Sequence, residues 1–146
     1  MWIPENEYKQ ILRKIPIPCV DLIIKNNQGE VLMVMRKNEP AKGEWWFPGG
    51  RIHHGESRNM AVKRKLKEEC GLISKSITEW KTLDIFLNNF TENYNTHAVS
   101  TFYLILINKS ELELDSQSSE AMWKKPTDWE KHISNPQIKN ILKEIN

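Results

Sequence analysis

The sequence predicts a single α/β domain over residues 1–146, in which helices cover both faces of a mixed sheet as an α/β/α sandwich. A chain of 146 residues has the length of one domain with a substantial core. Residues 22–24 and 31–35 are nearly continuous apolar runs, which are typical of strands buried on both faces. Segments with helical periodicity stand before, between and after the strands, and this order favours one layered domain.

The N-terminal segment predicts a short helix followed by a β-hairpin. Residues 4–14 are expected to form the helix, because their apolar side chains recur at helical spacing after a proline. Residues 17–25 and 30–36 are expected to be the two strands of the hairpin. Residues 26–29 join them, since Asn-Asn-Gln-Gly has the composition of a turn.

A tryptophan-rich loop is expected to lead into the central helix of the chain. Residues 38–47 form this loop, a Pro-Gly-Gly sequence closes it, and residues 51–55 make a short turn. Residues 57–70 are expected to be helical, with Ser57 as the N-cap and Gly71 as the residue that ends the helix.

The rest of the chain predicts three strands and two helices. The strands are expected at residues 77–86, 97–107 and 121–124, with loops at residues 88–95 and 111–120 between them. One helix is expected to start at Pro126 and the last at Pro136, because proline suits the first turn of a helix.

Charge and hydrophobicity exclude several classes of protein. Lys and Arg number 21 against 19 Asp and Glu, a balance that does not suit a nucleic-acid-binding surface. No apolar stretch approaches the roughly 20 residues of a membrane span, and the polar N-terminus lacks a signal-peptide core. We therefore expect a cytoplasmic protein with no nucleic-acid or membrane partner. Cys19 and Cys70 are too few for a disulfide framework and are expected to be buried thiols.

The central helix carries two adjacent glutamates beside an apolar stripe. At 100° per residue, Val62, Leu66 and Cys70 share one face of the helix. Glu69 lies roughly 60° from the middle of this face and Glu68 roughly 160° from it. An acidic side chain at the edge of a buried stripe needs a positive partner. Magnesium is one such partner, because it binds oxygen ligands and needs few carboxylates when substrate phosphates join in.

Ion pairs within the helix are the alternative to a metal. Arg64 with Glu68, and Lys65 with Glu69, have the i, i+4 spacing at which opposite charges stabilise a helix. Taken alone, the helix favours ion pairs over a metal site. The sequence around the helix favours the metal site.

The stretch around the helix resembles the signature of the Nudix hydrolase family. Eight of the nine fixed positions match, and Lys65 stands where the family has glutamate. The matched stretch consists of Gly50, Glu56, Arg64, Lys65, Leu66, Glu68, Glu69, Gly71 and Leu72. The resemblance implies the Nudix fold and Mg²⁺-dependent hydrolysis of a nucleoside diphosphate linked to another group. Lys65 argues against the usual attack on phosphorus with several metal ions.

Residues 17–51 resemble a narrower branch, the GDP-mannose mannosyl hydrolases, and the likeness continues to about Trp123. This branch also lacks glutamate at the position of Lys65. It cleaves GDP-mannose or GDP-glucose at the sugar C1 and releases GDP. The resemblance therefore implies a nucleotide-sugar substrate and, as is typical of the branch, a homodimer.

The same resemblance implies a metal site with few protein ligands. Glu69, the carbonyl of Gly49 and the side chain of Gln117 take the places of the ligands of one Mg²⁺. Glu68 is a further candidate metal ligand beside Glu69. Carboxylate, carbonyl and amide oxygens are the ligands that a hard cation prefers.

Two arginines and an aspartate are implied around the substrate. Arg36 and Arg51 resemble the arginines that contact the diphosphate, and Asp21 resembles a substrate contact. Cleaving the C1–O bond leaves negative charge on the β-phosphate, which guanidinium groups and a metal stabilise. We therefore expect Arg36, Arg51 and Glu69 to be catalytic. Arg64 resembles the signature arginine and is expected to pair with Glu56.

The group that activates water is missing from its expected position. The branch has a histidine directly after the ligand glutamine, where this chain has Ser118. It also has a tyrosine in the long strand, where this chain has Ala98. The candidate replacement bases are His97, Glu120, His53 and His54.

Three functions remain open. The favoured one is a Mg²⁺-dependent hydrolase of a GDP-mannose-like nucleotide sugar. The first alternative is a Nudix pyrophosphohydrolase of nucleoside diphosphate derivatives, which Glu68 and Glu69 favour and Lys65 disfavours. The second is a nucleotide-binding Nudix module with weak or no turnover, which Lys65, Ser118 and Ala98 motivate.

Overall fold

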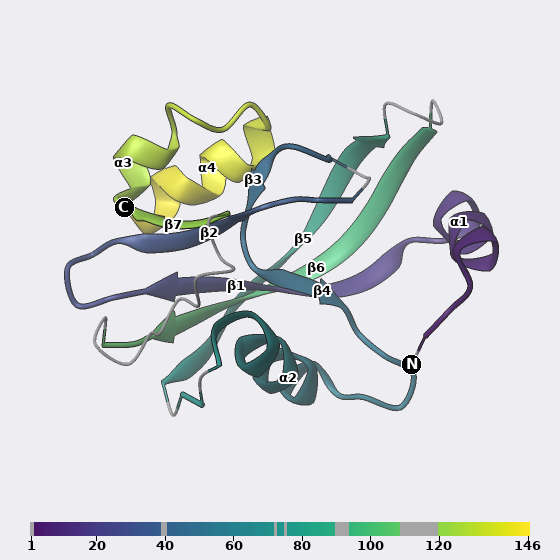
Figure 1. Ribbon diagram of the computed structural model, residues 1–146, viewed down its shortest axis with the longest axis horizontal. Helices are drawn as coiled ribbons and strands as arrows, with labels where there is room; N and C mark the ends of the chain where they lie inside the picture. Colours follow the sequence, from purple (N-terminus) through teal and green to yellow (C-terminus); the bar gives the residue numbers. More distant parts are fainter. Residues whose placement is uncertain (1, 39–40, 72, 75, 90–93, 109–119) are drawn as a thin grey trace.

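A mixed sheet forms the centre of the molecule (Figure 1). The computed structural model describes residues 2–38, 41–71, 73–74, 76–89, 94–108 and 120–146. Within these residues, seven strands form one sheet. β1 (Ile17–Lys25) runs parallel to β6 (Tyr94–Leu106), and β6 pairs antiparallel with β5 (Ile77–Asn89). The predicted mixed sheet is confirmed.

The other edge of β1 changes partner halfway along the strand. The remaining strands are β2 (Val31–Met35), β3 (Trp45–Trp46), β4 (Gly49–Arg51) and β7 (Ala121–Lys124). β4 pairs with the first half of β1, where Asp21 lies opposite Gly49, whereas β2 pairs with its end, where Lys25 lies opposite Val31. β2 also pairs antiparallel with both β3 and β7. The sheet therefore forks between β2 and β4.

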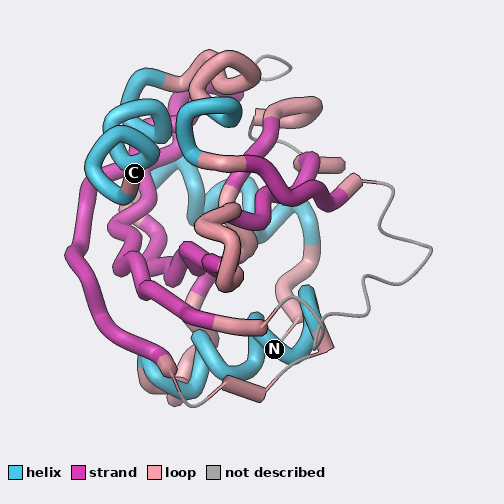
Figure 2. The backbone as a smooth tube through the Cα atoms, turned by 90° about the vertical axis from the view of Figure 1, so that its left-hand side faces the viewer, coloured by secondary structure: helices cyan, strands magenta, loops and turns pink. Residues whose placement is uncertain are grey.

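Helices cover both faces of the sheet (Figures 1 and 2). On one face, α3 (Pro126–Trp129) and α4 (Pro136–Ile145) bury apolar side chains in a cluster that includes Ile23. On the other face, α2 (Arg58–Cys70) buries its predicted apolar stripe in a cluster that includes Leu22. Neighbouring residues of β1 thus enter opposite cores, which explains its continuous apolar run and confirms the α/β/α sandwich.

The predicted helix ends are confirmed by their capping geometry. The Ser57 hydroxyl accepts a hydrogen bond from the Met60 amide at 3.2 Å, which satisfies one free N–H of the first turn of α2. Gly71 ends α2 with a φ of 66°, in the left-handed region that favours glycine. α1 (Glu5–Lys14) also lies within the predicted range. No helix in the described part of the chain is long and apolar enough to span a membrane.

Two predicted loops are wrong in part. The pairing of β5 with β6 continues from Ile77 to Asn89, so strand structure replaces both ends of the loop predicted at residues 88–95. A partner strand supplies the backbone hydrogen bonds there whatever the local composition. The tryptophan loop contains β3, and the Gly-Gly pair begins β4. The predicted loop at residues 111–120 lies almost entirely outside the described residues.

Candidate active site

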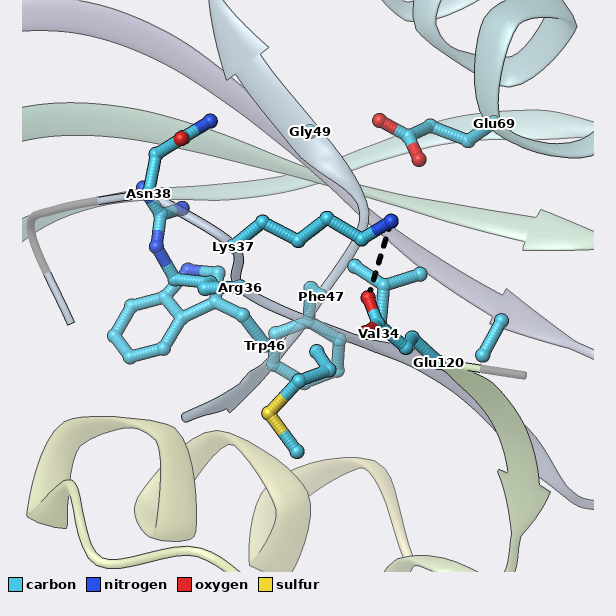
Figure 3. Close-up of a pocket in the computed structure, with 11 residues that line it drawn as sticks. Val34, Arg36, Lys37, Asn38, Trp46, Phe47, Gly49, Glu69 and Glu120 are labelled. Carbon is cyan, nitrogen blue, oxygen red and sulfur yellow. Dashed lines mark ion pairs between the residues drawn. The ribbon is translucent and has the colours of Figure 1, made fainter. Parts of the chain in front are cut away.

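A pocket of about 310 Å³ opens at the fork of the sheet (Figure 3). Arg36 reaches it from the end of β2, Gly49 from β4, Glu69 from α2 and Glu120 from the residue before β7. Figure 3 shows the Lys37 side chain extended across the pocket, with the Glu69 carboxylate entering from α2. The fork thus brings together two carboxylates and two cations from three separate parts of the chain.

Gly49 is at a position where only glycine fits. A Cβ atom added there would lie 2.3 Å from the carbonyl oxygen of Val20 and 2.7 Å from Oδ1 of Asp21. Both distances are shorter than any real Cβ contact, and the first is to backbone that cannot move aside. The glycine therefore lets β4 pass closely against β1 and places its own backbone on the pocket wall.

The predicted pair of Arg64 with Glu56 is confirmed, and it closes the turn before α2. Arg64 donates to Glu56 through Nε at 2.7 Å and through Nη2 at 2.9 Å. Nη2 also donates to the carbonyl of Arg51 at 3.1 Å, which ties α2 to β4. The hydrogen bonds from Arg64 lower the pKa of Glu56 to about 2 from its ordinary 4.5. The backbone N–H of His53 donates a further bond to the same carboxylate.

Replacing Glu56 with glutamine is expected to destabilise the protein by roughly 2–3 kcal/mol, because Arg64 loses its charged partner. Because the folded-state pKa is depressed, this contribution is complete above about pH 4.5 and disappears as the pH falls toward 2. Urea unfolding at several pH values measures it, and the gap between variant and wild type should close at acidic pH.

Glu68→Gln is the matched control, because Glu68 contacts the same Arg64 at 3.4 Å but its side chain is 51% exposed. An exposed pair of this kind contributes less than about 1 kcal/mol. Equal losses in the two variants would contradict a special role for the Glu56 pair.

Lys65 lies against both glutamates of the signature. Its Nζ is 2.9 Å from Oε1 of Glu69 and 3.1 Å from Oε2 of Glu68. Burial acts to raise the pKa of Glu68, but the hydrogen bond and charge of Lys65 and the charge of Arg64 lower it. Glu69 lines the pocket, whereas Glu68 lines neither this pocket nor the second one described below. Both i, i+4 pairs predicted from the sequence are present.

Glu120 faces the same pocket as Glu69, with Lys37 beside it. Its Oε2 atom is shielded from solvent and accepts no hydrogen bond from the described residues. The Nζ atom of Lys37 lies 3.3 Å from this oxygen as an ion pair. Lys37 was not among the predicted site residues, although its place directly after Arg36 was a usable signal.

A second pocket of about 130 Å³ shares the Arg36 and Gly49 walls with the first. Asp21 and Arg51 line it, as do Tyr8 of α1 and Thr96 of β6. The Arg51 guanidinium carbon lies 5.4 Å from the centre of the Tyr8 ring. The Thr96 hydroxyl is buried and has no hydrogen-bond partner among the described residues, and nothing in the sequence pointed to it.

Asp21 is a buried acidic residue in the wall of the second pocket. Burial raises its pKa to about 6, although a hydrogen bond from Ser100 and the charge of Arg36 act in the opposite direction. Arg36 and Asp21, which the resemblance places around the substrate, therefore line one continuous region with Arg51.

Only one of the four candidate bases lines the pocket of Glu69, and that one is Glu120. His97 lies on β6, where its Nε2 is 2.9 Å from Oδ1 of Asp84 and its ring stacks on Phe86. His53 and His54 lie in the turn before α2 and line neither of the two pockets. Gln117 and Ser118 lie outside the described residues.

The donor set suits one hard cation better than a cluster. Glu69 and the backbone of Gly49 face one pocket, and both supply oxygen ligands. Among the described residues, no three His, Cys, Asp or Glu side chains come close enough to hold a metal by themselves. Magnesium needs only one or two carboxylates when waters and substrate phosphates complete its shell. The residues present therefore fit a single ion.

Residues 16–145 match the model of the NUDIX domain. The protein Agl8 for low-salt glycan biosynthesis in Haloferax volcanii is 32% identical over 127 residues, which cover 81% of this chain and 76% of Agl8. An ADP-ribose pyrophosphatase of Methanocaldococcus jannaschii is 33% identical over 106 residues, which cover 73% of this chain and 60% of that protein. The chain therefore belongs to the Nudix hydrolase family.

Solved structures share the fold. The NUDIX domain of Shewanella oneidensis NrtR, in a complex with ADP ribose, superposes with a TM-score of 0.69 at 24% identity and covers 97% of this chain and 96% of its own. A MutT protein of Methanosarcina mazei Go1 has a TM-score of 0.71 at 20% identity and covers 90% and 94% of the two chains. These likenesses confirm the predicted Nudix fold.

Proposed function

We propose that the protein is a Mg²⁺-dependent hydrolase of a nucleotide sugar of the GDP-mannose or GDP-glucose type, which cleaves at the sugar C1 and releases GDP. The observation that carries this proposal is the pocket that holds Glu69, Glu120 and Arg36 together. Carboxylates and a guanidinium group around one cavity suit a diphosphate, a hard cation and a water molecule. The likeness to a protein of glycan biosynthesis supports a sugar-containing substrate.

Arg36 is the group best placed to stabilise the departing diphosphate. It lines both pockets, so a substrate that extends from one to the other passes its guanidinium. When the C1–O bond breaks, the β-phosphate oxygen gains negative charge, and charge-assisted hydrogen bonds to Arg36 stabilise that charge. Lys37 adds a second positive charge in the first pocket.

Glu120 is the group best placed to take a proton from the attacking water. It faces the pocket of Glu69, and its Oε2 atom accepts no hydrogen bond from the described residues, although the Lys37 ammonium lies 3.3 Å away as an ion pair. A positioned base of this kind accelerates a reaction by typically 10²- to 10⁴-fold. Glu120 thus substitutes for the histidine that Ser118 replaces.

Glu69 and the carbonyl of Gly49 are the groups that would hold the Mg²⁺ ion, with Gln117 and Glu68 as further candidate ligands from the resemblance. When bound, the ion supplies positive charge that stabilises the diphosphate as a leaving group. The chain's own contribution is to orient the Glu69 carboxylate, which Lys65 holds from one side. A homodimer and a cytoplasmic location stay predictions.

A pyrophosphohydrolase that breaks a phosphorus–oxygen bond is the second candidate. The likeness to an archaeal ADP-ribose pyrophosphatase favours it, as do the two signature glutamates. Lys65 counts against it, because a positive charge at this position disfavours the additional metal ions that such an attack commonly uses.

Product analysis with GDP-mannose and Mg²⁺ separates the candidates. We expect GDP and mannose, with ¹⁸O from labelled water in the sugar, because the attack is at C1. GMP and mannose 1-phosphate, with label in a phosphate, would place the protein with the pyrophosphohydrolases. Nucleotide-dependent thermal stabilisation without product, even at high enzyme concentration and with other nucleotide sugars, would favour the binding module.

A further inference from the structure

Lys65 occupies an enclosed position that is unusual for a lysine on a helix surface. Its side chain is only 15% exposed, and its Nζ contacts one oxygen of Glu69 and one of Glu68 at 2.9 and 3.1 Å. The stem packs against Gly50, where an added Cβ would lie 3.4 Å from Cε of Lys65. The neighbouring Lys63 on the same helix is exposed. Lys65 is therefore held in place from two sides.

The Lys65 ammonium binds the same atoms that a divalent cation would bind. A hard cation and an ammonium both require carboxylate oxygens, and Mg²⁺ binds them at about 2.0–2.1 Å. An ammonium 2.9 Å from Oε1 of Glu69 repels a second cation at that oxygen. The other oxygen of Glu69 stays available, because the Glu69 side chain is 30% exposed and lines the pocket.

We propose that Lys65 is a tethered cation that fills one of the cation positions of the Nudix site and so limits the protein to a single divalent ion. This inference rests on the metal-dependent function proposed above. Lys65 pairs with Glu68 and with one oxygen of Glu69, so the divalent ion is left with the other oxygen of Glu69. Lys65 is thus a positioning residue that acts through the carboxylates.

Titration with Mn²⁺ alone, followed by electron paramagnetic resonance and calorimetry, tests this inference without substrate. Wild type is expected to bind one Mn²⁺ per chain. Lys65→Met should bind one ion at least about tenfold more tightly, because a positive charge next to the ligand is removed. Lys65→Glu should bind two ions, because it adds a carboxylate where the ammonium lies.

Lys63→Met is the matched control, because it removes the same charge from an exposed position on α2. It should bind Mn²⁺ within about twofold of wild type. Thermal melting identifies any variant that does not fold. If Lys65→Glu does not fold, the comparison of Lys65→Met with Lys63→Met tests the inference by itself.

Three results would overturn the inference: two or more ions in wild type, a single ion in folded Lys65→Glu, or equal affinities in Lys65→Met and Lys63→Met. Absence of Mn²⁺ binding by wild type would remove the basis of both proposals. If the Mn²⁺ stoichiometries are as expected but no nucleotide sugar is hydrolysed, the proposed function is wrong and the inferred role of Lys65 is unaffected.

Discussion

Replacing Glu69 with glutamine is expected to lower kcat for nucleotide-sugar hydrolysis by about 10³-fold, because the neutral amide no longer holds a cation beside the departing diphosphate. The same variant should bind Mn²⁺ far more weakly than wild type. Its stability should change little, since the side chain is 30% exposed and pairs only with Lys65 among the contacts in the described residues. Steady-state kinetics with GDP-mannose and a parallel Mn²⁺ titration measure the two effects.

Glu68→Gln provides the graded comparison for Glu69. Its side chain is 51% exposed and points away from the pocket toward Arg64 and Lys65, so we expect a loss of less than about tenfold. Equal losses in the two variants would mean that both glutamates hold the ion, and the leading role assigned to Glu69 would then be wrong.

Glu120→Gln is expected to lower kcat by about 10²- to 10⁴-fold while Mn²⁺ binding is retained, because the variant loses a proton acceptor rather than a metal ligand. Steady-state kinetics together with the Mn²⁺ titration check both expectations.

The control for Glu120 is Glu44→Gln, because Glu44 is a partly buried glutamate that binds Ser134 and lines neither pocket. Its activity should stay close to that of wild type. Retained turnover in Glu120→Gln would exclude Glu120 as the base and reopen the search.

Local sequence signals predicted much of the fold. The apolar runs of β1 and β2 predict strands covered on both faces, and the two cores bear this out. Ser57 and Gly71 predict the ends of α2, because capping depends on a few neighbouring atoms. The Arg64–Glu56 pair was also predicted from its place in the signature and is present.

Long-range pairing was beyond the reach of such signals. β5 and β6 extend into a polar stretch because each strand pairs with the other. The sheet forks because β4 pairs with the first half of β1 and β2 pairs with its end. For the same reason the sequence left four bases open, and only tertiary structure places Glu120 beside Glu69. Thr96 carries no local signal, because its distinguishing feature is a buried hydroxyl with no hydrogen-bond partner in the described part of the chain.

The fork of the sheet divides the residues of the site between two structural units. One unit comprises β4 and α2, which the bond from Arg64 to the Arg51 carbonyl joins, and it carries Gly49 and Glu69. The other comprises β2, β3 and β7, where the Met35 amide bonds the Glu120 carbonyl at 2.7 Å, and it carries the remaining charged groups. A ligand that contacts both Glu69 and Glu120 would therefore connect the two units across the fork.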